Sequence, residues 1–551
     1  MTVVLVVSGG GFQGLGLVEA LSCIPGTRVM VADIHADNIT RYRCAGFQPM
    51  PPILDRDAFA ERLLDAVRTH SIDYIFPITE RELTALAELR GALSKEGADV
   101  AVSSAGLLDS LLDKGKAPDF LAGAGVHALP AMDPWRHDFS FPLFGKRRRG
   151  WGGTGTIVVE SRDELERKTA GGELADHVWF PYVEQFEEYS GDFCITRDCG
   201  LSPLTVRRRI RVSGGFAVIS ETSRDPMIAD LIESTARALT SNDGNGIFNV
   251  QVIAPVGGQP FVSDINPRMG TSAVHATLEG NNLPRFYMNG RQQPARGPRA
   301  AATPIKSVRL LTTLAIPIID RVPRAVVFDL DDTLVDHKLW VAAKMRLALA
   351  DVAGNWGDQE ALEECALRLI DEGERARLID RMAEAFFWDD GQRSRLIKAY
   401  REGVPDQTPL FTDVEPVLAA LSDAGLKLAL LTDNPVATQR SKIERSPVLR
   451  SIPTVVFSRE TGGEKPHSPS FAAVTGALGL HPSDLCMVGD NYFRDALGAI
   501  RAGYGRAYLV SRPGSFVQPH PDLSARFAED IQPVHRVDSL FSVRASLLGS
   551  V

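Results

Sequence analysis

Long apolar runs are missing from this sequence, and no stretch approaches the roughly twenty consecutive residues that a membrane-spanning helix needs. The start, Met1–Val7, is a short apolar strand followed by glycines. It shows neither a basic segment nor a cleavage site, so we expect no signal peptide. An excess of positive charge is missing too. The net charge of −9 argues against a general binder of nucleic acid or of anionic membranes.

Cysteine is scarce and scattered. The chain has 6 cysteines among 551 residues, and no two of them form a Cys-x-x-Cys pair. We therefore expect reduced thiols in a cytoplasmic protein. The rest of the composition is typical of a globular protein, with 44% hydrophobic and 23% charged residues. The length predicts about three or four structural units.

The most informative stretch is Ala325–Asp336. Its first four residues read as a buried strand, and carboxylates begin where that strand should end. Ligands of an open parallel sheet gather at the carboxyl ends of its strands. Asp329 and Asp331, two residues apart, are therefore expected to flank one small site. An ordinary turn at the end of a strand is the alternative, because Asp-Asp-Thr also forms such turns.

The first hundred residues alternate strands with helices. The strand Val3–Val7 leads into the glycine run Gly9–Gly14, and a second strand, Arg28–Asp33, ends in an acid. Formally this is the Gly-x-Gly-x-x-Gly dinucleotide fingerprint, so an NAD-dependent oxidoreductase is one alternative for the N-terminal half. The other is a doubly wound α/β domain that has the same turn but binds no dinucleotide. We expect this α/β domain to span residues 1–112.

Phosphate-binding features follow this domain. Lys146 ends an apolar strand and can reach a phosphate as a compact point charge. The next segment is rich in glycine, and its backbone N–H groups could close over phosphate oxygens where side chains would clash. The candidate glycines there are Gly152, Gly153 and Gly155. A plain flexible hairpin is the alternative. A further apolar strand, Trp179–Phe186, carries Glu184.

Gly246–Val252 and Phe261–Arg268 read as two adjacent antiparallel strands joined by a short linker of turn-forming residues. Because side chains alternate along a strand, Asp264 and Asn266 should share one face, and Gln251 can face them from the neighbouring strand. One carboxylate and two amides make an all-oxygen site suited to Mg²⁺ held jointly with substrate phosphates.

These motifs carry a resemblance. Residues 1 to about 318 resemble an ATP-grasp ligase, and 249–251 with 264–268 are similar to the metal-binding strands of the carbamoyl-phosphate synthetase large subunit. Arg268, two residues after Asn266, offers a fork for a phosphoryl group. The resemblance implies an ATP-grasp domain over 113–318, with Lys146, Glu184, Gln251 and Asp264 among the groups that bind ATP and metal.

The resemblance also implies a reaction class. ATP-grasp ligases activate a carboxylate as an acyl phosphate and let an amine attack it, releasing ADP and phosphate. Carbamoyl phosphate synthesis itself is not expected, because one ATP-grasp unit is found and no glutaminase segment. Asp264 stands where such ligases usually carry the longer Glu. This departure keeps open a non-catalytic ATP-binding module that regulates the rest of the chain.

The C-terminal part resembles the haloacid dehalogenase superfamily of phosphatases. Its motifs occur in order, each at the end of an expected strand or in the loop after one. They are Asp329 with Asp331, then Thr432, then Lys465 followed by Pro466, and last Asp490 with Asp495. One motif alone has a structural explanation, but all of them in register do not arise readily by chance.

This second resemblance implies a role for each residue. Asp329 would attack phosphorus and form an aspartyl-phosphate, while Asp331 would protonate the leaving oxygen and later activate water. Thr432 and Lys465 would hold the phosphoryl oxygens. Asp490 would bind the metal together with Asp329 and the backbone carbonyl of Asp331. Asp495 would act mainly from behind these ligands.

The expected fold is therefore α/β throughout. An α/β domain and an α+β ATP-binding domain precede a Rossmann-like hydrolase domain at 323–551, with an inserted α-helical cap at about 337–411. Phe386, Phe387 and Trp388 are expected in the core of the cap, with the lining of a substrate site as the alternative. Expected cofactors are ATP and Mg²⁺ (or Mn²⁺). Expected partners are small carboxylate, amine and phosphate-ester substrates, neither nucleic acid nor membrane, and a homo-oligomer stays open.

Overall fold

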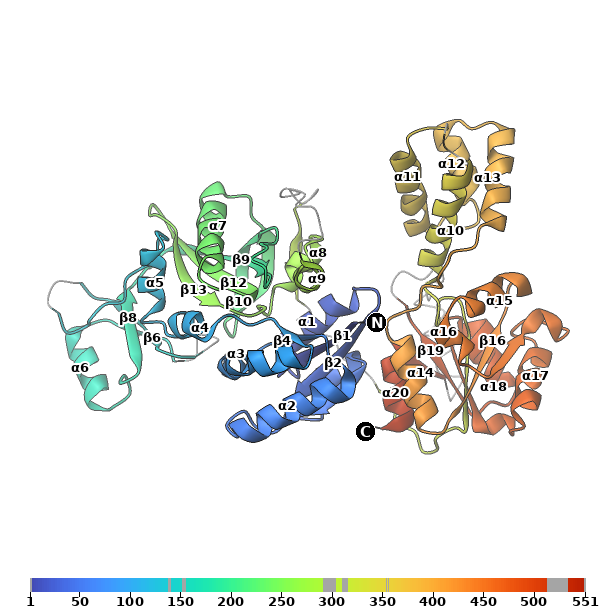
Figure 1. The fold of residues 1–551 in the computed structure, drawn as a ribbon, viewed down its shortest axis with the longest axis horizontal. Coiled ribbons are helices and arrows are strands. Elements are labelled where there is room, and N and C mark those ends of the chain that lie inside the picture. The colour runs from blue at the N-terminus through green and yellow to red at the C-terminus, as the bar shows by residue number, and fades with distance from the viewer. Residues whose placement is uncertain are drawn as a thin grey trace. The chain divides into compact units, whose positions relative to one another are not determined.

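The computed structural model describes residues 2–136, 140–150, 155–290, 304–309, 316–352, 354, 356–512 and 534–549. The chain divides into two units, Met1–Thr312 and Thr313–Val551 (Figure 1). The finer predicted boundary between residues 112 and 113 stays a prediction. Within the described ranges, none of the helices combines the length and the apolarity that crossing a membrane requires.

The N-terminal unit begins with a parallel sheet of strand order β3-β2-β1-β4-β5. Its strands are β1 (Thr2–Val7), β2 (Thr27–Asp33), β3 (Gly46–Pro49), β4 (Tyr74–Pro77) and β5 (Asp99–Val100). The helices of this part are α1 (Phe12–Ser22), α2 (Arg56–His70), α3 (Glu80–Lys95) and α4 (Ala105–Leu112). This confirms the predicted α/β fold of the first part of the chain.

The glycine run that leads from β1 into α1 packs closely against its own backbone. A Cβ atom at Gly14 would overlap the backbone of Gly9, so this close approach requires glycine. Asp33, at the end of β2, accepts the backbone N–H of Gly10 at 2.8 Å and that of His35 at 3.0 Å. Both carboxylate oxygens of Asp33 are thus engaged by nearby backbone.

Two antiparallel sheets complete this unit. The smaller has the order β7-β6-β8, and the larger β13-β12-β9-β10-β11-β14. The smaller contains β6 (Leu143–Arg147), β7 (Ile157–Val159) and β8 (His177–Pro181), with α6 (Arg162–Ala170) beside β7. The larger contains β9 (Phe186–Ile195), β10 (Thr205–Ser213), β11 (Phe216–Thr222), β12 (Gly246–Pro255), β13 (Phe261–Asn266) and β14 (Lys306–Val308). The remaining helices are α5 (Ala117–Gly123), α7 (Pro226–Thr240), α8 (Val274–Leu278) and α9 (Leu283–Asn289).

One predicted strand of this unit is wrong. Trp179–Phe186 is not continuous, because β8 ends at Pro181 and β9 begins at Phe186. Pro181 is the last residue of β8 paired with β6, opposite Leu143, and proline has no N–H with which to extend the ladder. Glu184 consequently lies in the connection between two different sheets.

The C-terminal unit is built on a parallel sheet of order β17-β16-β15-β18-β19-β20. Its strands are β15 (Ala325–Phe328), β16 (Lys427–Thr432), β17 (Thr454–Phe457), β18 (Leu485–Gly489), β19 (Arg506–Val510) and β20 (Val534–Val537). The helices around it are α14 (Val414–Asp423), α15 (Val436–Glu444), α16 (Pro447–Arg450), α17 (Ser468–Leu478), α18 (Gly498–Arg501) and α20 (Leu540–Leu548). This is the predicted Rossmann-like arrangement.

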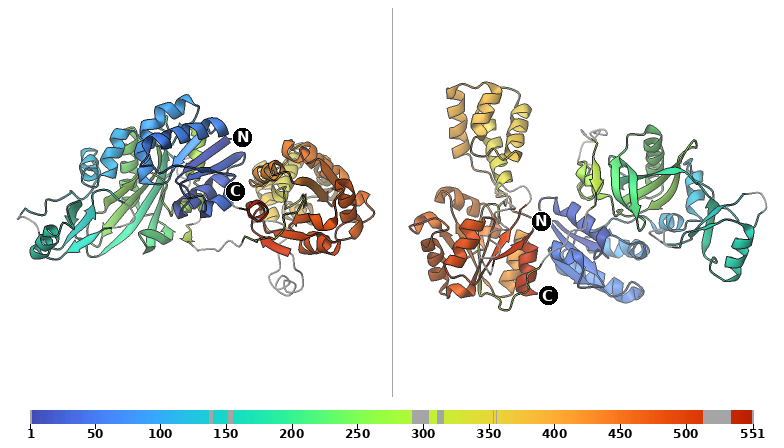
Figure 2. Two further views of the ribbon diagram at one scale, coloured as in Figure 1. Left: turned by 90° about the horizontal axis from the view of Figure 1, so that it is seen from below. Right: turned by 180° about the vertical axis from the view of Figure 1, so that it is seen from behind.

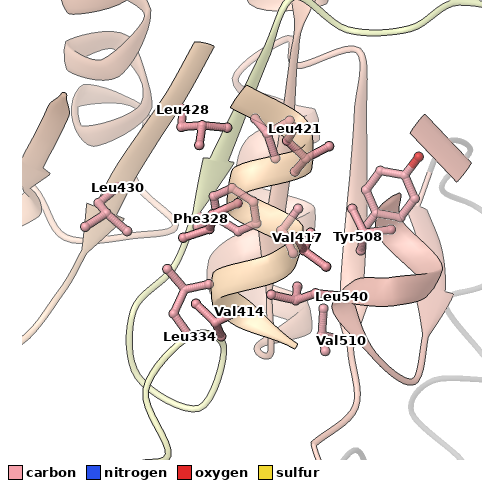
Figure 3. Close-up of a cluster of buried hydrophobic side chains, with 14 of the residues drawn as sticks. Phe328, Leu334, Val414, Val417, Leu421, Leu428, Leu430, Tyr508, Val510 and Leu540 are labelled. Carbon is pink, nitrogen blue, oxygen red and sulfur yellow. The ribbon is translucent and has the colours of Figure 1, made fainter. Parts of the chain in front are cut away.

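Each face of this sheet has its own core, since side chains alternate along a strand. Phe328 and its neighbours on one face pack against α14 and α20, as Figure 3 shows. Val327 points to the other face, where it meets Phe471 and Val474 of α17. β15 is buried along its whole length, and this burial fixes the strand in the core. The chain therefore leaves the sheet at one defined point, immediately before Asp329.

Between β15 and α14 the chain forms a helical bundle, drawn in yellow in Figures 1 and 2. Its helices are α10 (His337–Val352), α11 (Gln359–Asp371), α12 (Leu378–Phe386) and α13 (Asp390–Glu402). Phe386 and Trp388 pack against the core of this bundle, which confirms the expectation for these two side chains. Phe387 is 94% exposed, so the same expectation is wrong there. It caps α12 in a left-handed conformation that turns it outward.

Candidate active sites

Asp329 lies at the centre of the C-terminal site. It follows β15 directly, and its backbone N–H donates to the carbonyl of Val488 in the neighbouring strand at 2.9 Å. The ammonium of Lys465 lies 2.5 Å from Asp329 Oδ1 and 2.6 Å from Asp495 Oδ1. Lys465 is almost fully buried. Burial alone would lower its pKa, but Asp329 and Asp495 outweigh burial and raise that pKa.

Asp490 joins this group at the end of β18. Oxygens of Asp329, Asp490 and Asp495 lie within 4.8 Å of one another. Burial raises the pKa of Asp329 and of Asp490, and the neighbouring carboxylates raise both further. A cluster of carboxylates whose negative charges repel one another is suited to a hard divalent cation with oxygen ligands. The residues present therefore fit Mg²⁺.

The Asp331 side chain belongs to a separate set of contacts. The ammonium of Lys442 forms an ion pair with Asp331 Oδ1, and His337 Nδ1 lies 3.0 Å from the same oxygen. Oδ2 accepts from Asn434 at 3.0 Å and from Gln439 at 2.9 Å. Burial alone would raise the pKa of Asp331, but Lys442 and His337 outweigh it and hold that pKa well below its usual range.

Thr432 is the last residue of β16 and is buried. Its hydroxyl oxygen accepts from Gln439 Nε2 at 2.9 Å. The same amide nitrogen donates to Asp331 Oδ2, so Gln439 ties the end of β16 to the aspartate that follows β15. The structure thus brings together the side chains that the sequence assigned to the C-terminal site.

The N-terminal unit holds a cavity of about 390 Å³ between the two antiparallel sheets. Its lining combines apolar side chains with a few charged groups. It includes Lys114, Leu129, Phe144, Lys146, Phe180, Glu188, Arg209, Gln251 and Asp264. Such a lining is typical of sites that bind small molecules.

Lys146 is held inside this cavity. Its ammonium donates to the carbonyl of Ser263 at 3.0 Å and lies 5.6 Å from the ring centres of both Phe144 and Phe180. Burial lowers the pKa of Lys146, and the nearby Lys114 lowers it further, while Asp264 opposes this. Lys114, which the sequence analysis gave no role, also lines the cavity, and it donates to the carbonyl of Gly150 at 2.6 Å.

The predicted antiparallel pairing of β12 with β13 is confirmed, with Gln251 opposite Asp264. Asn266 donates to Asp264 Oδ2 at 3.2 Å and accepts from Arg268 at 3.2 Å, so these groups form one connected row. Arg268 is buried, and its Nε atom has no hydrogen-bond partner among the described residues. The row thus ends in an arginine with unused donor capacity.

The remaining residues predicted for this site either do not line the cavity or lie outside the described residues. Glu184 is exposed and does not line the cavity, whereas Glu188 does. Gly155 has a φ of +76°, and a Cβ atom there would overlap the side chain of Arg147. Gly152 and Gly153 lie outside the described residues.

Residues 326–508 match the family model described as haloacid dehalogenase-like hydrolase. The phosphoglycolate phosphatase of Shigella dysenteriae serotype 1 is 30% identical over 230 residues, covering 36% of this chain and 90% of that protein. The phosphoglycolate phosphatase of Yersinia pestis is 26% identical over 231 residues, covering 39% of this chain and 95% of that protein. Through its C-terminal unit, the chain belongs to the haloacid dehalogenase-like hydrolase family.

Solved structures are similar to the N-terminal half of the chain. N5-carboxyaminoimidazole synthetase from Staphylococcus aureus, complexed with ADP, is 17% identical with a TM-score of 0.43, covering 53% of this chain and 78% of that one. Biotin carboxylase from Campylobacter jejuni is 15% identical with a TM-score of 0.43, covering 52% of this chain and 70% of that one.

Lys442, Gln439 and His337 are residues of the haloacid dehalogenase-like site that the sequence analysis missed. Gln439 and Lys442 are three residues apart on α15, so they project from one side of that helix. That spacing, directly after the Thr432 strand, was the available signal.

Gly489 sets the position of Asp495 in this haloacid dehalogenase-like site. A Cβ atom at Gly489 would overlap the Asp495 carboxylate. We expect Gly489→Ala to displace that carboxylate and to slow phosphate-ester hydrolysis about 10- to 100-fold, as changes behind metal ligands typically do. Gly476→Ala is the matched control, because a Cβ atom there meets nothing within 4 Å. Equal rates for Gly489→Ala and wild type would contradict this role.

Proposed function

We propose that the chain is a bifunctional enzyme. The C-terminal unit hydrolyses a small phosphate ester with the help of Mg²⁺, and the N-terminal unit joins a carboxylate to an amine at the expense of ATP. The phosphatase is supported above all by the grouping of Asp329, Lys465, Asp490 and Asp495 at the carboxyl ends of parallel strands. The family to which this unit belongs agrees with that chemistry.

The first chemical step would use Asp329 as nucleophile. One of its oxygens attacks phosphorus, the bond to the leaving oxygen breaks, and Asp331 supplies the proton that the leaving alcohol needs. Lys465 and Thr432 hold the phosphoryl oxygens, on which negative charge accumulates. Asp329, Asp490 and the carbonyl of Asp331 would hold Mg²⁺, with Asp495 close behind. When bound, Mg²⁺ supplies positive charge that offsets the charge of the phosphate.

The second step would hydrolyse the aspartyl-phosphate. A water molecule gives a proton to Asp331 and attacks phosphorus, and inorganic phosphate leaves while Asp329 is restored. The ionised state in which Lys442 holds Asp331 is the one that this step needs. The first step needs the protonated carboxyl, so the contact with Lys442 has to loosen when the leaving group arrives.

The ligase is supported by the cavity between the two antiparallel sheets. This cavity is largely apolar. Its charged and polar lining groups include the ammonium groups of Lys146 and Lys114, the amide of Gln251 and the carboxylate of Asp264. A nucleotide base fits the apolar part, and Mg²⁺ with phosphates fits the charged part. Arg268, with its unpaired Nε, would stabilise the phosphoryl group of an acyl phosphate. The NAD alternative is weakened because Asp33 is already bonded to nearby backbone.

The test uses the Asp329→Asn protein, in which the second unit no longer removes phosphate. With Mg-ATP and pools of carboxylates and amines, we expect ADP and phosphate to form only with certain pools. Adding Asp264→Ala should reduce this turnover at least about 100-fold, because a ligand for the metal is lost. Asp230→Ala, an exposed aspartate on α7, is the matched control and should change nothing.

Two other outcomes would reassign the N-terminal unit. Tight ATP binding without turnover in any pool, together with phosphatase rates that change with ATP, would indicate a regulatory nucleotide module. Stoichiometric NAD binding without binding of a nucleoside triphosphate would indicate an oxidoreductase.

A further inference from the structure

Two aspartates separated by one residue each have a buried lysine of their own. Lys465 contacts Asp329, whereas Lys442 contacts Asp331, and both lysine side chains are 1% exposed. Lys465 follows β17, whereas Lys442 is on α15. Each aspartate thus has its own lysine: Lys465 contacts the nucleophile, and Lys442 contacts the aspartate that transfers protons.

Lys442 is fixed from several sides. Its ammonium lies 5.6 Å from the ring centre of Trp340 and 3.5 Å from His337 Nδ1, and both of these residues are on α10. Its own carbonyl accepts from the hydroxyl of Thr408 at 2.7 Å. Among the described residues, Asp331 is the carboxylate within ion-pair distance of this ammonium. Burying an ammonium without a carboxylate partner costs free energy, so the contact with Asp331 stabilises Lys442 in its buried position.

The remaining contacts of Asp331 fix its rotation. Lys442 and His337 occupy Oδ1, while Asn434 and Gln439 occupy Oδ2. Donors on both oxygens leave the carboxylate plane little freedom. Of these donors, Lys442 brings a full positive charge, and Asp331 is its carboxylate partner among the described residues, so removing it should change the orientation of Asp331 most.

We propose that Lys442 is a positioning residue for the water-activating step of the phosphatase, acting by holding the Asp331 carboxylate in a fixed orientation. This inference rests on the proposed aspartyl-phosphate mechanism. It assigns Lys442 to hydrolysis of the intermediate and not to attack by Asp329, because Lys442 contacts the proton-handling aspartate and Lys465 contacts the nucleophile.

The test follows both steps in the full-length Lys442→Met protein with 4-nitrophenyl phosphate. Its leaving group needs little protonation, so attack by Asp329 should stay near the wild-type rate. Loss of a positioned base should slow the second step about 100-fold. We therefore expect a rapid burst of about one 4-nitrophenolate per active site, then slow turnover, with phosphoenzyme recovered after an acid quench. Lys427→Met, which removes an exposed lysine at the other end of β16, should behave as wild type.

Other results would overturn the proposal. Turnover equal to wild type would show that Lys442 does not position Asp331. A burst that slows as much as the steady state would place Lys442 in the first step. If Lys442→Met does not fold, Lys442→Arg decides: it keeps the buried charge but moves the donors, so a burst should again precede slowed turnover, and its absence would count against the role. Failure of the proposed phosphatase itself is distinct, since wild type would then not hydrolyse the substrate.

Discussion

Asp329→Asn should reduce phosphate-ester hydrolysis at least about 10³-fold, because an amide cannot attack phosphorus to form the acyl-phosphate bond. The substitution is nearly isosteric and removes one of the clustered negative charges, so the unit should stay folded. Steady-state hydrolysis of 4-nitrophenyl phosphate measures the loss. ATP turnover by the N-terminal unit should remain within about two-fold of wild type, because Asp264 and Lys146 belong to the other unit.

The reciprocal variant makes this a test of two separate sites. Asp264→Ala should abolish ADP formation and leave 4-nitrophenyl phosphate hydrolysis unchanged. If either substitution abolishes both activities, the sites are not independent, and the division of labour between the units is wrong. If Asp329→Asn keeps full phosphatase activity, the nucleophile has been misassigned.

Lys465→Met should destabilise the C-terminal unit by about 3–5 kcal/mol near neutral pH, since it leaves buried carboxylates without their cation. Lys465 contacts Asp329 and Asp495 directly and lies 3.8 Å from Asp433. Hydrogen exchange of peptides from β15 and β18 as a function of urea would report the stability of this unit alone. Lys398→Met, which removes an exposed lysine on α13, is the control and should change that stability by less than about 0.5 kcal/mol.

The pH dependence of this loss identifies its cause. Burial already raises the pKa of Asp329, and Lys465 is the main influence that lowers it, so that pKa rises further in Lys465→Met. The folded variant then binds more protons than the unfolded chain above the ordinary aspartate pKa. Its stability must fall as pH rises and recover as pH falls. An equal loss at pH 5.5 and at pH 8.5 would instead indicate lost packing.

The strand ends of the C-terminal site could be predicted because each motif is local. Asp329, Thr432 and Asp490 follow buried apolar strands, and the ends of neighbouring parallel strands meet at one edge of a sheet. Likewise the pairing of Gln251 with Asp264 follows from strand alternation and a short hairpin. In both cases a few consecutive residues hold all the information that the prediction needed.

The rest depends on contacts between distant segments. Lys442 reaches Asp331 across 111 residues, and the spacing of Gln439 and Lys442 on α15 does not by itself identify the aspartate that they contact. Glu184 was misplaced for a similar reason: its apolar neighbours suggested one strand, whereas pairing with β6 ends at Pro181. Phe387 resembles its neighbours in the sequence, and only the end of α12 turns it outward.

β15 also limits which changes of sequence this protein can accept in evolution. Its four residues alternate between two separate cores, with Phe328 in one and Val327 in the other. A single inserted residue would exchange these memberships and carry Asp329 to the opposite side of the sheet. Hydrophobic replacements of similar size should be tolerated along this strand. Its length should therefore vary far less than the identity of its residues.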